Sequence, residues 1–168
     1  MADAVTLVTE LPAPVGPVLV DLDAVAEAGL AELYDLERRG ELTVGVARSR
    51  CEGFGLAVAT AVDLLVAAPS ATFGRPGRWS PVVLRRGEGI VGRRAAGYLV
   101  MTGRSIGAAT ALDWGLVSHV ADDPVAAATE LVASIAARSP VAVRTILAQA
   151  HRGAAADYTA LRATSRLV

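Results

Sequence analysis

The clearest pattern in the chain is a series of short apolar runs separated by polar or glycine-containing breaks. Leu42–Ala47 is rich in β-branched residues and predicts a buried strand. After a polar break, Gly53–Gly55 opens the small apolar run Leu56–Val62, which predicts a buried helix. Leu64–Ala67 predicts a second buried strand. The order strand, glycine-containing turn, helix, strand is typical of an α/β fold.

The flanking regions predict strands on the N-terminal side and mostly helices on the C-terminal side. Val5–Thr9 and Val18–Asp23 predict strands, and Ala24–Arg39 predicts a helix with one apolar face. We expect Asp21 and Asp23 to cap that helix rather than to take part in catalysis. Downstream, Leu116–Val120 predicts an extended segment. The sequence also predicts helices over Val91–Thr102, Ser105–Trp114, Pro124–Arg138, Ser139–Arg152 and Ala156–Leu167.

The glycine-containing turn is the best candidate for a binding site. Glycines between a strand and a helix let the backbone approach a ligand, and the first turn of the helix leaves N–H groups free. Such groups can hold a polarised carbonyl oxygen, although many turns of this kind have no binding role. Glu52 is either a general base or a solvated loop carboxylate. Cys51 is either a thiolate nucleophile or a packed, inert thiol.

Composition narrows the function classes. The chain has 168 residues, of which 53% are hydrophobic and 20% charged, which excludes a disordered protein. A net charge of −1 argues against nucleic-acid or membrane binding as the main task. A single Cys forms no internal disulfide, so we expect a cytoplasmic protein. The spacing of the residues predicts no metal site, P-loop or dinucleotide-binding fingerprint, and we expect no required cofactor.

Several motifs together resemble the crotonase superfamily, which includes enoyl-CoA hydratases and isomerases. The resemblance covers residues 43–150, and its most specific part is Val100–Val120, a Leu-Thr-Gly-x-x-Ile-x-Ala type of run. The other motifs are Gly53–Gly55, the strand after Asp63, Ser70–Pro76, Val91–Arg104 and Ile135–Val143. The resemblance implies an α/β crotonase-like spiral of strand-strand-helix turns, truncated at its N-terminal end, with a helical C-terminal region. We expect a single domain over 1–168, with a divergent N-terminal part (1–42), a core (43–120) and C-terminal helices (121–168).

The resemblance also assigns the family's reacting groups to positions of this chain. The backbone N–H that binds the oxyanion falls on Phe54, between Gly53 and Gly55. Phe54 either donates that N–H or fills the pocket with its ring. The two catalytic glutamates of the hydratases fall on Ala57 and Gly77, and neither residue can transfer a proton. The resemblance therefore does not imply the usual hydratase mechanism.

Two further departures concern substrate binding. In the family, an Ala-Gly-x-Asp loop supplies a second oxyanion N–H, and we expect the chain to pass from Asp23 into a helix without it. The segment after Arg75 is also shorter than in the family. Its side chains either bind the phosphates and a flat group of the ligand or belong to a solvated or subunit-facing loop; they are Arg75, Arg78, Trp79, Arg85 and Arg86.

The resemblance implies a protein that acts on an acyl thioester of CoA or of a carrier protein (a phosphopantetheine arm). Polarisation of the carbonyl stabilises an enolate, which serves isomerisation, dehydration, decarboxylation or cyclisation, with Glu52 as the candidate for proton transfer. The alternative is a non-catalytic crotonase-fold scaffold or partner subunit. The family also implies a homo-oligomer, a trimer or hexamer, for which the Ala-rich segment 124–137 suits close helix contact.

Overall fold

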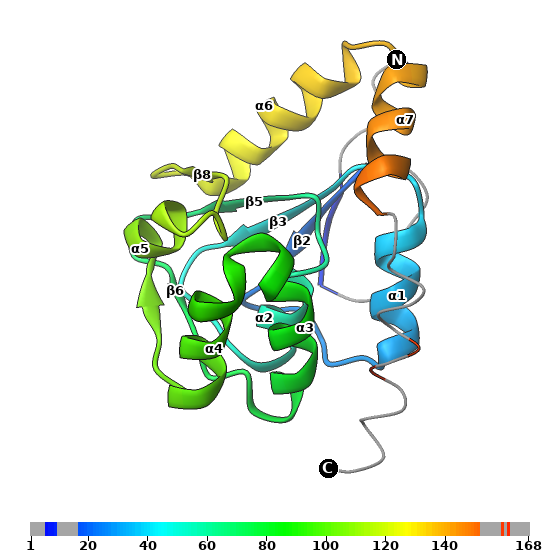
Figure 1. Cartoon of the computed structure of the whole chain (residues 1–168). Coiled ribbons are helices and arrows are strands. Elements are labelled where there is room, and N and C mark those ends of the chain that lie inside the picture. Colours follow the sequence, from blue (N-terminus) through cyan, green and yellow to red (C-terminus); the bar gives the residue numbers. More distant parts are fainter. Residues whose placement is uncertain (1–5, 10–16, 152–158, 160, 162–168) are drawn as a thin grey trace.

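The fold is built on a parallel β-sheet with a smaller sheet beside it. The computed structural model describes residues 6–9, 17–151, 159 and 161 (Figure 1). The main sheet consists of β1 (Thr6–Val8), β2 (Val18–Asp21), β3 (Thr43–Ala47), β5 (Leu64–Ala67) and β8 (His119–Val120). These strands lie in the order β1–β2–β3–β5–β8, and every pairing is parallel. The smaller sheet consists of β4 (Arg50–Cys51), β6 (Thr72–Phe73) and β7 (Ile106–Gly107).

The central part of the chain winds as a spiral. One turn runs from β3 through β4 into helix α2 (Gly53–Ala59), and the next runs from β5 through β6 into the 3₁₀ helix η1 (Gly77–Trp79). Because β3 pairs with β5 and β4 pairs with β6, each turn adds one strand to each sheet. This arrangement confirms the predicted α/β spiral of strand-strand-helix turns.

The main sheet is covered on both faces. On β3, Val44 and Val46 pack with the buried side of helix α6 (Pro124–Ala136). On β2, Val18 and Val20 belong to the other core cluster, which contains α2. Strands buried on both faces need apolar residues at nearly every position, which explains the continuous apolar runs of the sequence.

The other helices are α1 (Leu30–Arg38), α3 (Ser80–Ile90), α4 (Gly92–Thr102), α5 (Ala108–Asp113) and α7 (Pro140–Ala150). The predicted helices at α4, α6 and α7 are confirmed with boundaries within two residues. The helix predicted over Ser105–Trp114 is shorter, because its first residues form β7. The helix predicted over Ala156–Leu167 falls almost entirely outside the described residues. Within the described residues, no single helix is long and apolar enough to cross a membrane; α6 and α7 pass that test only together, and they are bent by 114°.

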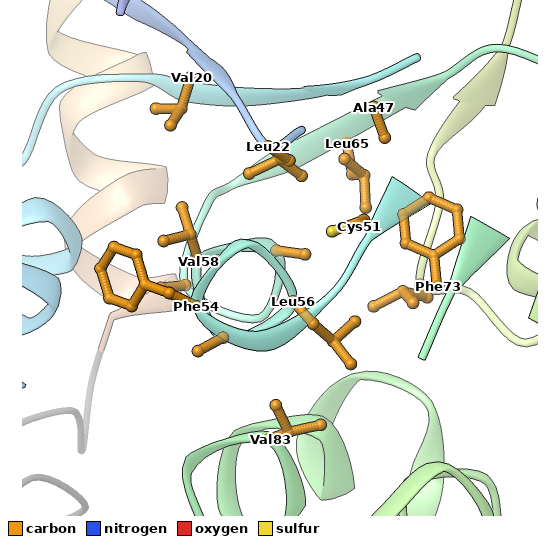
Figure 2. Close-up of a cluster of buried hydrophobic side chains, with 14 of the residues drawn as sticks. Val20, Leu22, Ala47, Cys51, Phe54, Leu56, Val58, Leu65, Phe73 and Val83 are labelled. Carbon is orange, nitrogen blue, oxygen red and sulfur yellow. The ribbon is translucent and has the colours of Figure 1, made fainter. Parts of the chain in front are cut away.

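Helix α2 is buried almost throughout because its residues are small. Figure 2 shows it between the main sheet and α3, with Phe54 and Phe73 on opposite sides of it. A Cβ atom on Gly55 would lie 2.3 Å from the carbonyl oxygen of Leu22. Leu22 follows β2 directly and donates its N–H to the Val46 carbonyl (2.9 Å). Glycine at position 55 therefore lets α2 pack directly against the end of β2.

The segment between β2 and α1 corrects the sequence prediction. The helix predicted from Ala24 begins only at Leu30, after a loop that spans residues 22–29. The carboxylate of Asp23 accepts hydrogen bonds from the backbone N–H groups of Arg48 (2.5 Å) and Ser49 (3.0 Å). Asp21 forms an ion pair with the Arg48 side chain. Both aspartates thus join the ends of β2 and β3, and neither caps α1, so the cap prediction was wrong.

Candidate functional site

The N-terminus of α2 presents a free backbone donor, as the sequence predicts. Gly53 has φ +54°, a conformation that favours glycine, and its N–H donates to the Arg75 carbonyl (3.1 Å). The next N–H, that of Phe54, has no hydrogen-bond partner among the described residues. Arg75 is itself strained, with φ +47°. The chain therefore accepts backbone strain where β6 leads into η1, beside this helix end.

The Phe54 ring packs against Trp79. The two ring centroids lie 4.8 Å apart with an interplanar angle of 53°, and both side chains are buried. A tilted aromatic pair of this kind is worth about 0.5–1.5 kcal/mol beyond its buried area. The structure thus places the Phe54 ring in the core, and the same residue still has its free N–H.

Glu27, which the sequence analysis did not single out, fixes Trp79 from the other side. Its carboxylate oxygen Oε1 accepts hydrogen bonds from the Trp79 indole N–H and from the Arg78 Nε–H, both at 2.7 Å. These bonds, that of Trp79 first, lower the pKa of Glu27. No local sequence signal identifies Glu27, because its partners lie 51 and 52 residues away. Its charged form orients Trp79 and Arg78.

A cavity of about 290 Å³ lies against this cluster. Arg78 and Trp79, both predicted from the sequence as ligand-lining residues, contribute to its wall. The lining residues are Ala28, Gly29, Leu30, Arg78, Trp79, Pro81, Val82 and Leu161. The cavity thus lies among the loop before α1, η1 and the start of α3.

The loop before α1 also corrects an expectation about the second N–H donor. The sequence analysis expected no Ala-Gly-x-Asp loop, but Ala28-Gly29-Leu30 stands at the N-terminus of α1 and lines the cavity. Ala31 occupies the place of the Asp in that pattern. The backbone N–H of Leu30 has no partner among the described residues, as is usual for the first residue of a helix. A loop with the Ala-Gly pair but without the Asp is therefore present before α1. The sequence did not predict it because residues 24–28 contain no glycine, proline or other turn residue.

The other predicted site residues are not among the residues that line this cavity. Glu52 precedes α2 and is partly buried, and its carboxylate makes no hydrogen bond or ion pair with the described residues. Arg75 and Gly77 are exposed. Ala57 is completely buried in α2. Arg85 and Arg86 lie on α3, not in a loop, and Arg86 pairs with the buried Glu37.

Cys51 is buried completely and cannot touch a ligand in this conformation. Figure 2 shows its side chain within the apolar cluster, near Leu65. Burial raises the pKa of the Cys51 thiol well above its usual value, and the charges of Asp23 and Glu52 act in the same direction. A high pKa favours the neutral thiol, so the geometry fits the packing interpretation of Cys51 rather than the nucleophile.

The groups of the site are mainly hydrogen-bond donors and one cation, with few side chains that could accept a proton. Its donors are the N–H groups of Leu30 and Phe54 and the Arg78 guanidinium. The Glu27 carboxylate is already bound, and Glu52 is the nearest other carboxylate in sequence to the Phe54 N–H. Among the described residues, no three acidic, His or Cys side chains converge as a metal site would require. The arrangement can stabilise negative charge on a bound oxygen.

Known proteins share both the sequence and the fold. The sequence pattern of the enoyl-CoA hydratase/isomerase family matches residues 22–167. The chain is 42% identical over 85 residues to cyclohexa-1,5-dienecarbonyl-CoA hydratase of Thauera aromatica, a match that covers 48% of this chain and 33% of that protein. It is 30% identical over 154 residues to mevalonyl-coenzyme A hydratase of Aspergillus fumigatus, covering 76% of this chain and 57% of that protein.

Among solved structures, an enoyl-CoA hydratase from Mycobacterium smegmatis superposes with a TM-score of 0.71 at 28% sequence identity. That match covers 92% of this chain and 79% of the other. The chain therefore matches about a third to somewhat more than half of the length of the two curated relatives, but most of the length of the solved structure.

Proposed function

Because the chain belongs to the enoyl-CoA hydratase/isomerase family, we propose that it binds an acyl thioester, of CoA or of a carrier protein, and polarises the thioester carbonyl. The observation that carries the proposal is the pair of free backbone N–H groups at two helix N-termini. Phe54 lies at the start of α2 and packs on Trp79, and Leu30 lies at the start of α1 and lines the cavity together with Trp79. Two such donors are the usual means of holding an oxyanion.

The cavity suggests how the ligand lies. Its volume of about 290 Å³ is at the lower limit of small-molecule sites, which favours a short acyl group. Leu30, Pro81 and Val82 provide apolar walls for that group. The Arg78 side chain is 69% exposed and stands at the rim, where it would pair with a phosphate of CoA or of a phosphopantetheine arm.

The reaction would differ from ordinary hydration. With Ala57 and Gly77 in place of the paired glutamates, addition of water would lose two groups that each contribute about 10²–10⁴-fold. A reaction that needs mainly enolate stabilisation is compatible with the remaining groups, and isomerisation, dehydration, decarboxylation and cyclisation are of this kind. Glu52 would transfer the proton, because its carboxylate is not bound to another described residue.

A non-catalytic binding protein is the second candidate. The observation that favours it is that the Glu27 carboxylate is held by Trp79 and Arg78, two residues of the cavity wall, and so is a weak base. In either case we propose a homo-oligomer. The exposed apolar side chains of Met101 (82%) and Leu112 (42%) provide one surface for its contacts.

Calorimetric titration with CoA, acetyl-CoA and crotonyl-CoA tests the binding proposal. We expect the acyl forms to bind more tightly than CoA, because only they present a carbonyl to the two N–H groups. Arg78→Ala should weaken all three ligands by about three- to tenfold through the lost phosphate contact. Arg93→Ala, at an exposed arginine of α4 away from the cavity, is the matched control. Failure of all three ligands to bind at millimolar concentration contradicts a CoA site.

Turnover separates the two candidates. If Glu52 transfers the proton, Glu52→Gln should abolish turnover of an acyl thioester that must first be deprotonated, as in isomerisation, and leave the thioester affinity and the melting temperature unchanged. A wild-type protein that binds crotonyl-CoA but converts none of the acyl thioesters supplied supports the non-catalytic candidate.

A further inference from the structure

The wall of the candidate site contains one large ring, that of Trp79. Leu30, whose N–H is one of the two proposed carbonyl donors, and Trp79 both line the cavity of about 290 Å³. An acyl chain attached to a carbonyl at Leu30 therefore starts in the same cavity that Trp79 borders. Among the described residues that line this cavity, Trp79 is the only aromatic one. Truncating it frees more space than truncating any other lining side chain.

Three contacts fix the Trp79 ring in place. It packs on the Phe54 ring, with centroids 4.8 Å apart, and its indole N–H donates to Glu27 Oε1 (2.7 Å). The Arg78 guanidinium lies 5.6 Å from the centroid of the same ring. Trp79 is 7% exposed, so moving the ring aside would break the N–H bond and the aromatic pair together. A ligand thus meets Trp79 as a fixed wall.

A fixed wall limits the length of an acyl chain. Each methylene that enters an apolar cavity should raise the affinity about fourfold, whereas a methylene that stays in water adds little. On the basis of the proposed function, we propose that the Trp79 ring sets the longest acyl chain that the cavity accepts. Glu27 is then a positioning residue, because it holds the ring without lining the cavity itself.

Calorimetric titration with CoA and with acetyl-, butanoyl-, hexanoyl- and octanoyl-CoA tests this limit. In the wild type, the affinity should rise with chain length and level off before octanoyl-CoA. Trp79→Leu should raise the ratio of octanoyl-CoA to butanoyl-CoA affinity by about tenfold or more, the effect of roughly two further methylenes. Trp114→Leu is the matched control at the other tryptophan of the chain, which packs on Tyr98 outside this cavity, and it should leave the ratio unchanged.

Two variants of Glu27 test its positioning role without removing the ring. The Glu27 side chain is 51% exposed, so both variants should fold even if Trp79→Leu does not. Glu27→Ala removes the acceptor of the indole N–H and should raise the same affinity ratio about fourfold, the effect of one methylene. Glu27→Gln keeps an oxygen that accepts this N–H and should retain the wild-type ratio.

The outcomes separate this inference from the proposed function. A wild-type affinity that keeps rising by a constant factor up to octanoyl-CoA overturns the chain-length limit and leaves the proposed function intact. The limit is overturned as well if neither Trp79→Leu nor Glu27→Ala raises the ratio, or if Trp114→Leu raises it equally. A ratio that rises in Trp79→Leu but not in Glu27→Ala overturns the positioning role of Glu27. If none of the acyl forms binds more tightly than CoA, the proposed function fails, and the limit fails with it.

Discussion

The contact between Gly55 and the end of β2 makes a quantitative prediction about the stability of the site. In the Gly55→Ala variant, the new Cβ atom would lie 2.3 Å from the Leu22 carbonyl oxygen, whereas ordinary contact begins at 3.4 Å. One of the two groups must therefore retreat by about 1.1 Å. Neither retreats freely. Leu22 is 2% exposed and bonded to Val46, and α2 is buried on nearly all sides.

The expected cost follows from the close packing of protein interiors. Inserting a methyl group into a well-packed core typically costs about 1–3 kcal/mol. The gain that alanine brings to a helix, about 0.4–1 kcal/mol over glycine, offsets part of this cost. We therefore expect a net loss of about 1–2 kcal/mol in the free energy of unfolding. For a chain of this size, that loss lowers the melting temperature by roughly 2–8 °C.

Urea unfolding of Gly55→Ala, compared with Gly89→Ala, tests this reasoning. Gly89 lies in α3, and a Cβ atom there would meet nothing within 4 Å, so Gly89→Ala should be neutral or stabilising by up to about 1 kcal/mol. Gly55→Ala should also weaken thioester binding, because Phe54 moves with the helix. Equal unfolding free energies of the two variants would show that α2 does not pack tightly against the end of β2.

Three further predictions concern single side chains. Trp79 and Arg78 lower the pKa of Glu27, so the stability that this carboxylate contributes is present above its ordinary pKa. That stability is lost as the pH falls through the lowered pKa. Glu27→Gln should therefore make the melting temperature depend less on pH in the acid range. The buried Cys51 should react with a thiol reagent at pH 8 at least about a thousandfold more slowly in the folded protein than in urea. Asp63→Asn should cost about 1.5–3 kcal/mol of unfolding free energy because it weakens the bonds to Thr43, whereas the exposed Asp122→Asn should cost less than about 0.5 kcal/mol.

The parts of the fold that the sequence predicts well are those that local pattern determines. The strands β3 and β5 and helix α2 follow from apolar runs and glycines within a single window, as does α6 with Pro124 at its first position. The spiral of the two sheets came from the family resemblance instead. No local pattern indicates that the two-residue strands β4 and β6 pair, because the paired residues, Arg50 with Thr72 and Cys51 with Phe73, lie 22 positions apart in the sequence.

The errors arise where tertiary contacts override local pattern. Helix α1 begins at Leu30 rather than at Ala24, because Asp23 binds the backbone of Arg48 and Ser49, and Ala26 donates its N–H to Thr9. Helix α3 was predicted as a loop. Its glycines and arginines interrupt the helical spacing of apolar residues, and only the structure shows that Val82 and Val83 form a buried face.

Only one of the two backbone donors of the candidate site could be predicted from the sequence, for a related reason. A free N–H at a helix start can be inferred from a glycine-containing turn, and Phe54 was found in that way. The role of Glu27 depends on contacts with Arg78 and Trp79 more than 50 residues away. The second donor, Leu30, required the true start of α1. Long-range contacts thus determine which groups meet at the cavity.

The distribution of charge around the cavity limits the chemistry that the proposed function allows. Glu27 is used to hold Trp79 and Arg78. Ala57 and Gly77 stand at the positions that the family resemblance assigns to the paired glutamates. The groups that remain stabilise an anion and leave Glu52 as the candidate proton carrier. We expect a site of this composition to favour decarboxylation, in which the breaking C–C bond supplies the electrons of the enolate. Substrates from which a base must first remove a proton should react more slowly. On this reasoning Glu52→Gln should impair an isomerisation more severely than a decarboxylation, and the ratio of the two rates distinguishes the reaction classes.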